Sequence, residues 1–132
     1  MRGILLYVEA TGCPLSSAFT KSAMRSDASF SRSIDVAYDK RGDELTLCIT
    51  YAEPRDGGKN ATAAACTRAT GSENLTVEPF KVIFRQEPAW NSSLHFGSRF
   101  VFAADDLVYI TTGERSLPAT RGYSQDVNAT LG

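Results

Sequence analysis

The chain of 132 residues lacks the features that mark several large classes of protein. Its 14 lysines and arginines are balanced by 15 aspartates and glutamates, so no basic surplus is available to neutralise the phosphates of a nucleic acid. No uninterrupted apolar run approaches the roughly 18 to 20 residues that a membrane-spanning helix requires. We therefore expect neither a nucleic-acid-binding protein nor a chain that spans a membrane with a helix.

Cysteine is also scarce, and its spacing argues against a structural zinc site. None of the three cysteines, Cys13, Cys48 and Cys66, forms a Cys-x-x-Cys pair. Cys48 and Cys66 lie in neighbouring predicted strands and could pair across a sheet in an oxidising compartment, which would leave Cys13 without a partner. The alternative is that they are small buried hydrophobic residues. The sequence leaves both interpretations open.

The chain has a single histidine, His95, which stands immediately before a predicted β-hairpin that ends in Glu114. Imidazole is the one side chain whose unperturbed pKa, roughly 6.5, lets it exchange protons near neutrality. A carboxylate brought against it by the hairpin would fix its tautomer. The pattern predicts His95 and Glu114 as a catalytic pair. The alternative is a half-buried structural histidine whose ring nitrogens satisfy backbone groups.

Alternating apolar and polar residues predict an all-β chain. The alternation indicates six strands, which we place at 34–38, 45–51, 62–67, 75–84, 99–103 and 107–112. The turns between them are rich in Gly and Asp, as hairpin connections require. This spacing is that of an antiparallel meander, in which the first four strands form one sheet and the last two begin a second.

Several motifs together resemble the glucose/sorbosone dehydrogenase family, whose members are six-bladed β-propellers that use pyrroloquinoline quinone. Members typically contain His-x-Gly-x-Arg, then Tyr-(Leu/Ile)-x-x-Gly-Asp, then Gln-Asp-Leu. This chain has His95-Phe-Gly-Ser-Arg99, then Tyr109-Ile-Thr-Thr-Gly-Glu114, then Gln125-Asp-Val127. The resemblance continues upstream through 34–54 and 82–88, so it covers about residues 34–132.

The resemblance implies an incomplete propeller of one to two blades. A blade of four strands takes roughly 40 to 45 residues, so six blades need on the order of 250. We therefore expect a fragment or truncated gene product, with a partial propeller domain at 34–132. Residues 1–33 match nothing in the family and are expected to be an unassigned leader, whose partial disorder is left open. An exposed strand edge would favour self-association.

The resemblance also implies oxidation of a sugar hydroxyl, with hydride transfer from an aldose to the quinone. His95 matches the general base, and Glu114 takes the position of an aspartate that supports it. Arg99 matches the arginine of the His-x-Gly-x-Arg motif, as a structural, charge-setting or cofactor-binding residue. Arg115 and Gln125 match positions near the cofactor rim and are expected to bind the cofactor. The family's calcium ligands and the basic residues that bind the cofactor come from later blades. The isolated chain is therefore expected to bind the quinone and calcium poorly and to be inactive alone.

Two other functions are compatible with the same residues. Replacement of the family's aspartate by Glu114 favours a non-enzymatic module, derived from a propeller, that binds carbohydrate or protein. A nonfunctional truncated remnant is the other alternative, and it would aggregate through its exposed edge.

The expected location is outside the cytoplasm, either secreted, extracellular or periplasmic. All four asparagines stand in Asn-x-Ser/Thr sequons, which favours a secretory route. The N-terminal apolar stretch argues against a conventional signal peptide, because Glu9 interrupts it.

Overall fold

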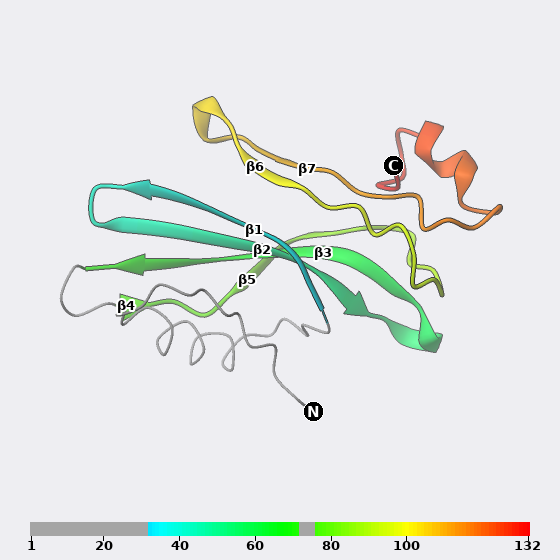
Figure 1. The fold of residues 1–132 in the computed structure, drawn as a ribbon, viewed down its shortest axis with the longest axis horizontal. Helices are drawn as coiled ribbons and strands as arrows, with labels where there is room; N and C mark the ends of the chain where they lie inside the picture. Colours follow the sequence, from blue (N-terminus) through cyan, green and yellow to red (C-terminus); the bar gives the residue numbers. More distant parts are fainter. Residues whose placement is uncertain (1–31, 72–75) are drawn as a thin grey trace.

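The computed structural model describes residues 32–71 and 76–132, and these form two antiparallel sheets (Figure 1). The described residues contain seven strands and three short 3₁₀ turns, and no α-helix. The predicted leader lies almost entirely outside the described residues, as does Cys13.

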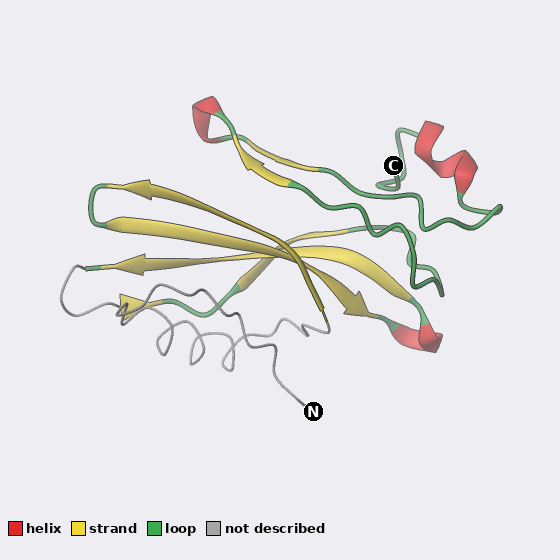
Figure 2. Ribbon diagram, viewed as in Figure 1, coloured by secondary structure: helices red, strands yellow, loops and turns green. Residues whose placement is uncertain are grey.

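The larger sheet begins with two long hairpins. Strand β1 (Arg32–Arg41) pairs with β2 (Glu44–Pro54), and β2 pairs with β3 (Asn60–Thr70). Two shorter strands, β4 (Thr76–Val77) and β5 (Lys81–Arg85), both pair with β3. The antiparallel meander expected for the first blade is present (Figure 2).

The fourth predicted strand, 75–84, is wrong as a continuous element, because 78–80 interrupt it between β4 and β5. Pro79 has no backbone N–H to donate to a strand ladder. The next residue, Phe80, turns into the core and is only 2% exposed. The Thr67 hydroxyl donates to the carbonyl of Glu78 at 2.6 Å, which holds the interruption against β3.

The core lies on both faces of the larger sheet, because β3 carries small side chains that let other elements approach closely. Ala63, Ala64 and Ala65 have no exposed surface. Phe80 packs on one face with Ile49, Tyr51, Ala63 and Ala65. On the other face, Cys48 and Ala64 pack against Phe100.

Phe100 belongs to the second sheet, a hairpin of β6 (Phe100–Phe102) and β7 (Val108–Ile110) that packs over β1 and β2 (Figure 1). It corresponds to the last two predicted strands, 99–103 and 107–112. The 3₁₀ turn η2 (Ala104–Asp106) joins its two strands.

Cys48 and Cys66 form a disulfide between β2 and β3, with an S–S distance of 2.00 Å. The two residues stand directly opposite each other in the strand register, and their Cα atoms are 4.1 Å apart. Of the two interpretations that the sequence leaves open, the structure shows the cross-strand pair.

Three connections gather at one end of the sheet (Figure 1). They are the turn η1 (Asp56–Gly58) between β2 and β3, the segment 86–99, and the C-terminal segment with η3 (Arg121–Gln125). The β1–β2 turn and η2 lie at the opposite end, where Nη1 of Arg41 is 2.5 Å from Oδ1 of Asp106. The predicted catalytic pair lies at the first of these ends.

Candidate functional site

His95 and Glu114 are in direct contact. Nδ1 of His95 lies 2.8 Å from Oε1 of Glu114 and 3.1 Å from Oε2. A carboxylate only accepts hydrogen bonds, so Nδ1 carries the proton in the neutral ring and Nε2 keeps its lone pair. The His95 side chain is 56% exposed, which leaves the ring accessible to a substrate.

The backbone brings the pair together. The amide of Gly113 donates to the carbonyl of Phe96 at 3.0 Å, and the amide of Arg115 donates to the carbonyl of His95 at 3.2 Å. These two bonds set the histidine turn directly beside the segment that carries Glu114. The predicted hairpin therefore extends past β6 and β7 as a pair of bonded backbone segments.

Two glycines make this close approach possible. A Cβ at Gly97 would stand 2.5 Å from the backbone nitrogen of Gly113, and a Cβ at Gly113 would collide with the carbonyl oxygen of His95. Gly97 also has a φ of +68°, which glycine adopts without steric cost. The glycines of His-x-Gly and Gly-Glu are thus required by the geometry that joins the pair.

Buried polar side chains anchor both segments to β3. The Thr62 hydroxyl donates to the carbonyl of Phe96 at 2.8 Å. The Gln86 amide donates to the carbonyl of Gly113 at 2.8 Å and accepts from the amide of Thr62 at 3.2 Å. Gln86 has no exposed surface, so this network is fixed within the protein.

The carboxylate of Glu114 is favoured in its ionised form. The hydrogen bond with His95 lowers the pKa of the Glu114 carboxyl below its ordinary value of 4.5, and backbone hydrogen bonds lower it further. Near neutral pH the group is therefore charged and can hold the Nδ1 proton. This arrangement allows Nε2 to accept a proton from a hydroxyl group.

Arg115, one of the residues predicted near the cofactor rim, has no exposed surface. The guanidinium carbon is 3.4 Å from the centre of the Phe96 ring. Nη2 donates to Oδ1 of Asn60 and to the carbonyl of Ser92. Burial lowers the pKa of Arg115 to about 10, so the group is still charged near neutral pH. A contact between Arg115 and a cofactor stays a prediction. In this conformation the guanidinium contacts Asn60, Ser92 and Phe96.

Arg99 and Gln125 are exposed, and neither is hydrogen-bonded to His95 or Glu114 in the part of the chain that the structure describes. Nη1 of Arg99 lies 3.8 Å from Oδ1 of Asp35, so its charge is partly balanced. Their proposed contact with a cofactor stays a prediction.

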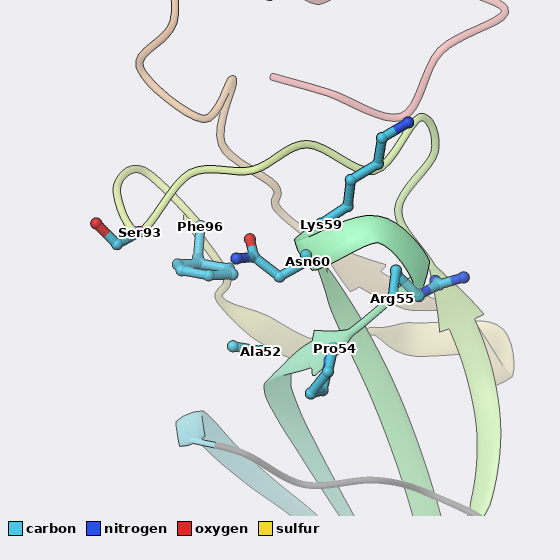
Figure 3. Close-up of a pocket in the computed structure, with 8 residues that line it drawn as sticks. Ala52, Pro54, Arg55, Lys59, Asn60, Ser93 and Phe96 are labelled. Carbon is cyan, nitrogen blue, oxygen red and sulfur yellow. The ribbon is translucent and has the colours of Figure 1, made fainter.

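A hollow of about 440 Å³ opens beside the histidine turn (Figure 3). The residues that line it include Arg55, Lys59, Asn60, Ser93 and Phe96. In Figure 3 the amide of Asn60 points toward the Phe96 ring, whereas the charged ends of Arg55 and Lys59 point away. The hollow lies between the β2–β3 turn and the segment that leads into His95. Polar groups beside an aromatic ring suit a ligand with hydroxyl groups.

The described residues fit the role of a base better than that of a cofactor holder. Of the two arginines predicted near the quinone, Arg115 is committed to internal partners and Arg99 faces Asp35. Within 32–71 and 76–132, no group of three or more His, Cys, Asp or Glu residues could hold a metal ion. Arg99 and Gln125 are the exposed side chains that could contact the quinone from this chain. Within the same ranges, no helix has the length and apolar character needed to cross a membrane.

Sequence reasoning missed the residues that support the pair. Thr62 and Gln86 carry no motif, since their role depends on partners many positions away in the chain. Asn60 stands out in the sequence only as part of a sequon, although its side-chain oxygen accepts a hydrogen bond from Arg115. The glycines at 97 and 113 were the available signal, because they belong to the quoted motifs.

Known proteins with the same pattern are sugar dehydrogenases. The family model described as Glucose / Sorbosone dehydrogenase matches residues 33–132. Aldose sugar dehydrogenase YliI of Escherichia coli (strain K12) is 34% identical over 87 residues, which cover 65% of this chain and 22% of that protein.

Two solved structures are similar in fold and sequence. One glucose dehydrogenase has a TM-score of 0.55 at 33% identity, covering 66% of this chain and 24% of its own. A second has a TM-score of 0.59 at 30% identity, covering 76% and 28%. The chain thus spans about a quarter of the length of these relatives. The predicted fold class, an all-β antiparallel piece of a propeller, is confirmed.

Proposed function

Since the chain belongs to the glucose/sorbosone dehydrogenase family, we propose that it supplies the catalytic base for oxidation of a hydroxyl group of an aldose. The observation that carries this proposal is the 2.8 Å contact between Nδ1 of His95 and Oε1 of Glu114. In the neutral ring this contact leaves the lone pair on Nε2, and the exposed side chain lies at the end of the sheet where the hollow opens.

In the proposed reaction, Nε2 of His95 accepts the proton of the hydroxyl on the anomeric carbon. The imidazolium that forms is stabilised by the carboxylate of Glu114, which stays ionised because its pKa is lowered. Loss of a hydride from the same carbon completes the oxidation to a lactone. Pyrroloquinoline quinone, the cofactor that the resemblance implies, would supply the two-electron acceptor for that hydride.

Most of the groups that would hold the quinone and calcium are expected from later blades, as the resemblance implies. Arg99 and Gln125 are exposed and are proposed to face the cofactor or the sugar from this chain. The disulfide between Cys48 and Cys66 supports an oxidising, extracytoplasmic location, since such bonds are rare in reducing compartments.

The test is an assay of aldose oxidation with quinone, calcium and a dye acceptor. It uses the chain alone and the longest reading frame that contains it. We expect turnover to fall by roughly 10²- to 10⁴-fold in His95→Ala, since that is the usual contribution of a general base. Leu94→Ala is the matched control, because Leu94 is the exposed neighbour of His95 and has no proposed role.

Equal turnover in His95→Ala and the unchanged protein would reject His95 as the base. If neither form oxidises any aldose, the redox function is rejected. Direct binding of sugars measured by calorimetry would then identify a carbohydrate-binding module.

A further inference from the structure

Arg115 connects the histidine turn to the rest of the protein through several contacts at once. Its guanidinium stacks on Phe96, immediately after His95, and Nη2 donates to the carbonyl of Ser92, three positions before it. The Ser92 hydroxyl in turn donates to the carbonyl of Arg115 at 2.6 Å. Arg115 therefore contacts the turn on both sides of His95, at Ser92 and at Phe96.

The same guanidinium attaches the turn to β3. Nη2 also donates to Oδ1 of Asn60, the first residue of that strand. The backbone of Asn60 exchanges hydrogen bonds with Trp90 in both directions, at 2.9 and 3.1 Å. Asn60 and Phe96 are among the side chains in the wall of the hollow in Figure 3, so Arg115 supports that wall from the interior.

Stability alone does not explain a charged group at this position. Nε and Nη1 of Arg115 are buried without a hydrogen-bond partner among the described residues. Burying an incompletely paired charge is costly, and apolar residues of similar size often replace such groups without loss of stability. Arg115 and Ser116 also have φ values of +69° and +57°, a conformation that is unfavourable for residues with a side chain. Such costs are typical of residues retained for the geometry that they impose.

We propose that Arg115 is a positioning residue that fixes the turn of His95 so that the imidazole meets Glu114. A planar guanidinium can stack on a ring and donate to two acceptors together, which neither lysine nor an apolar side chain can do. The consequence for catalysis rests on the proposed function. The effect on the orientation and tautomer of His95 does not.

The test uses nuclear magnetic resonance on the 132-residue chain, in which His95 is the only histidine and its ring signals need no assignment. Long-range ¹H–¹⁵N spectra distinguish the Nδ1–H from the Nε2–H tautomer. The unchanged chain is expected to show mainly the Nδ1–H form of the neutral ring. In Arg115→Met and Arg115→Lys, we expect a large loss of the Nδ1–H form, while the denaturation midpoint of Arg115→Met stays close to that of the unchanged chain.

Arg121→Met is the matched control, since Arg121 is an exposed arginine in η3, and it is expected to leave the tautomer unchanged. If Arg115→Met fails to fold, Asn60→Ala removes the acceptor while keeping the guanidinium, and a loss of Nδ1–H is again expected. An unchanged tautomer in the folded Arg115 and Asn60 variants would overturn the inference.

Activity separates the inference from the proposed function. In a form that oxidises aldoses, Arg115→Lys is expected to lower kcat by up to roughly 10²-fold, the scale of a small misplacement of a catalytic group. Suppose that the Arg115 variants change the tautomer of His95 but that turnover does not depend on His95. That result would reject His95 as the catalytic base and support the positioning role of Arg115. A kcat loss in Arg115→Lys without any change in the tautomer would overturn the positioning role and leave the base in place.

Discussion

Oε1 of Glu114 lies 2.8 Å from Nδ1 of His95, although 18 residues separate the two in the chain. The contact exists because two backbone hydrogen bonds flank it. One runs from the amide of Gly113 to the carbonyl of Phe96, and the other runs from the amide of Arg115 to the carbonyl of His95. An exposed imidazole held in this way has a defined proton acceptor at Nε2.

The contact should make stability depend on pH. Its hydrogen bond lowers the pKa of Glu114 in the folded state, so the stabilisation is present above the ordinary glutamate value of 4.5. It is lost as the pH falls through the lowered pKa. We expect the free energy of unfolding of the unchanged chain to exceed that of Glu114→Gln at neutral pH and to converge with it under acid, as measured by urea denaturation.

The control for this experiment is the same comparison in a His95→Ala background. Removing the imidazole removes the main cause of the lowered pKa of Glu114, so the pH-dependent part of the difference should shrink. A difference of the same size with and without His95 would show that the contact contributes nothing to stability.

Gly97 should tolerate no side chain. A Cβ there would stand 2.5 Å from the nitrogen of Gly113, so Gly97→Ala must push the two backbone segments apart. We expect a loss of about 1 to 3 kcal/mol from overpacking, beyond the cost of the backbone conformation. The tautomer preference of His95 should be lost as well.

Gly42→Ala isolates the conformational cost. Gly42 has a φ of +60°, close to the +68° of Gly97, but nothing lies within 4 Å of a Cβ built on it. Alanine there should cost only about 1 to 2 kcal/mol, measured by urea denaturation, and leave the His95 signals unchanged. Equal losses at the two glycines would contradict the close approach that we describe.

The disulfide should contribute measurably to stability. It closes a loop with a sequence separation of 18, for which the chain-entropy model gives about 3 kcal/mol. We expect a reductant to lower the urea midpoint of the unchanged chain and to have no effect on Cys48→Ala/Cys66→Ala. Under denaturing conditions without reductant, one thiol per chain should react, and three reactive thiols would disprove the pairing.

Gln86 should be required for the local geometry. Gln86→Leu is similar in size but leaves the carbonyl of Gly113 and the amide of Thr62 without their side-chain partner. Each unsatisfied buried group costs about 1 to 3 kcal/mol. Gln125→Leu, at an exposed position, is the control and should change the unfolding free energy little. Similar losses in both variants would contradict the role of the Gln86 network.

Local patterns predicted the parts of this fold that depend on neighbours in the sequence. Alternation indicated the hairpins of β1 to β3, and the two motif glycines accompanied the pair that they join. The prediction of one strand at 75–84 was wrong because apolar residues recur on both sides of the interruption at Pro79 and Phe80. The missing backbone N–H of Pro79 outweighed the hydrophobic pattern at that point.

Burial of Arg115 could not be predicted in the same way. An arginine after a Gly-Glu motif is expected at the surface, and only the assembled fold supplies Asn60, Ser92 and Phe96 as its partners. Thr62 and Gln86 were missed for the same reason. The sequence therefore predicted the contact between His95 and Glu114 and not the buried side chains that hold it.

The most direct test of the account is chemical rescue of His95→Ala in the form of the protein that oxidises an aldose. The account predicts that the variant loses roughly 10²- to 10⁴-fold in kcat and that added imidazole restores part of the rate in proportion to its unprotonated fraction. Full activity in His95→Ala without imidazole would contradict the claim that His95 is the base.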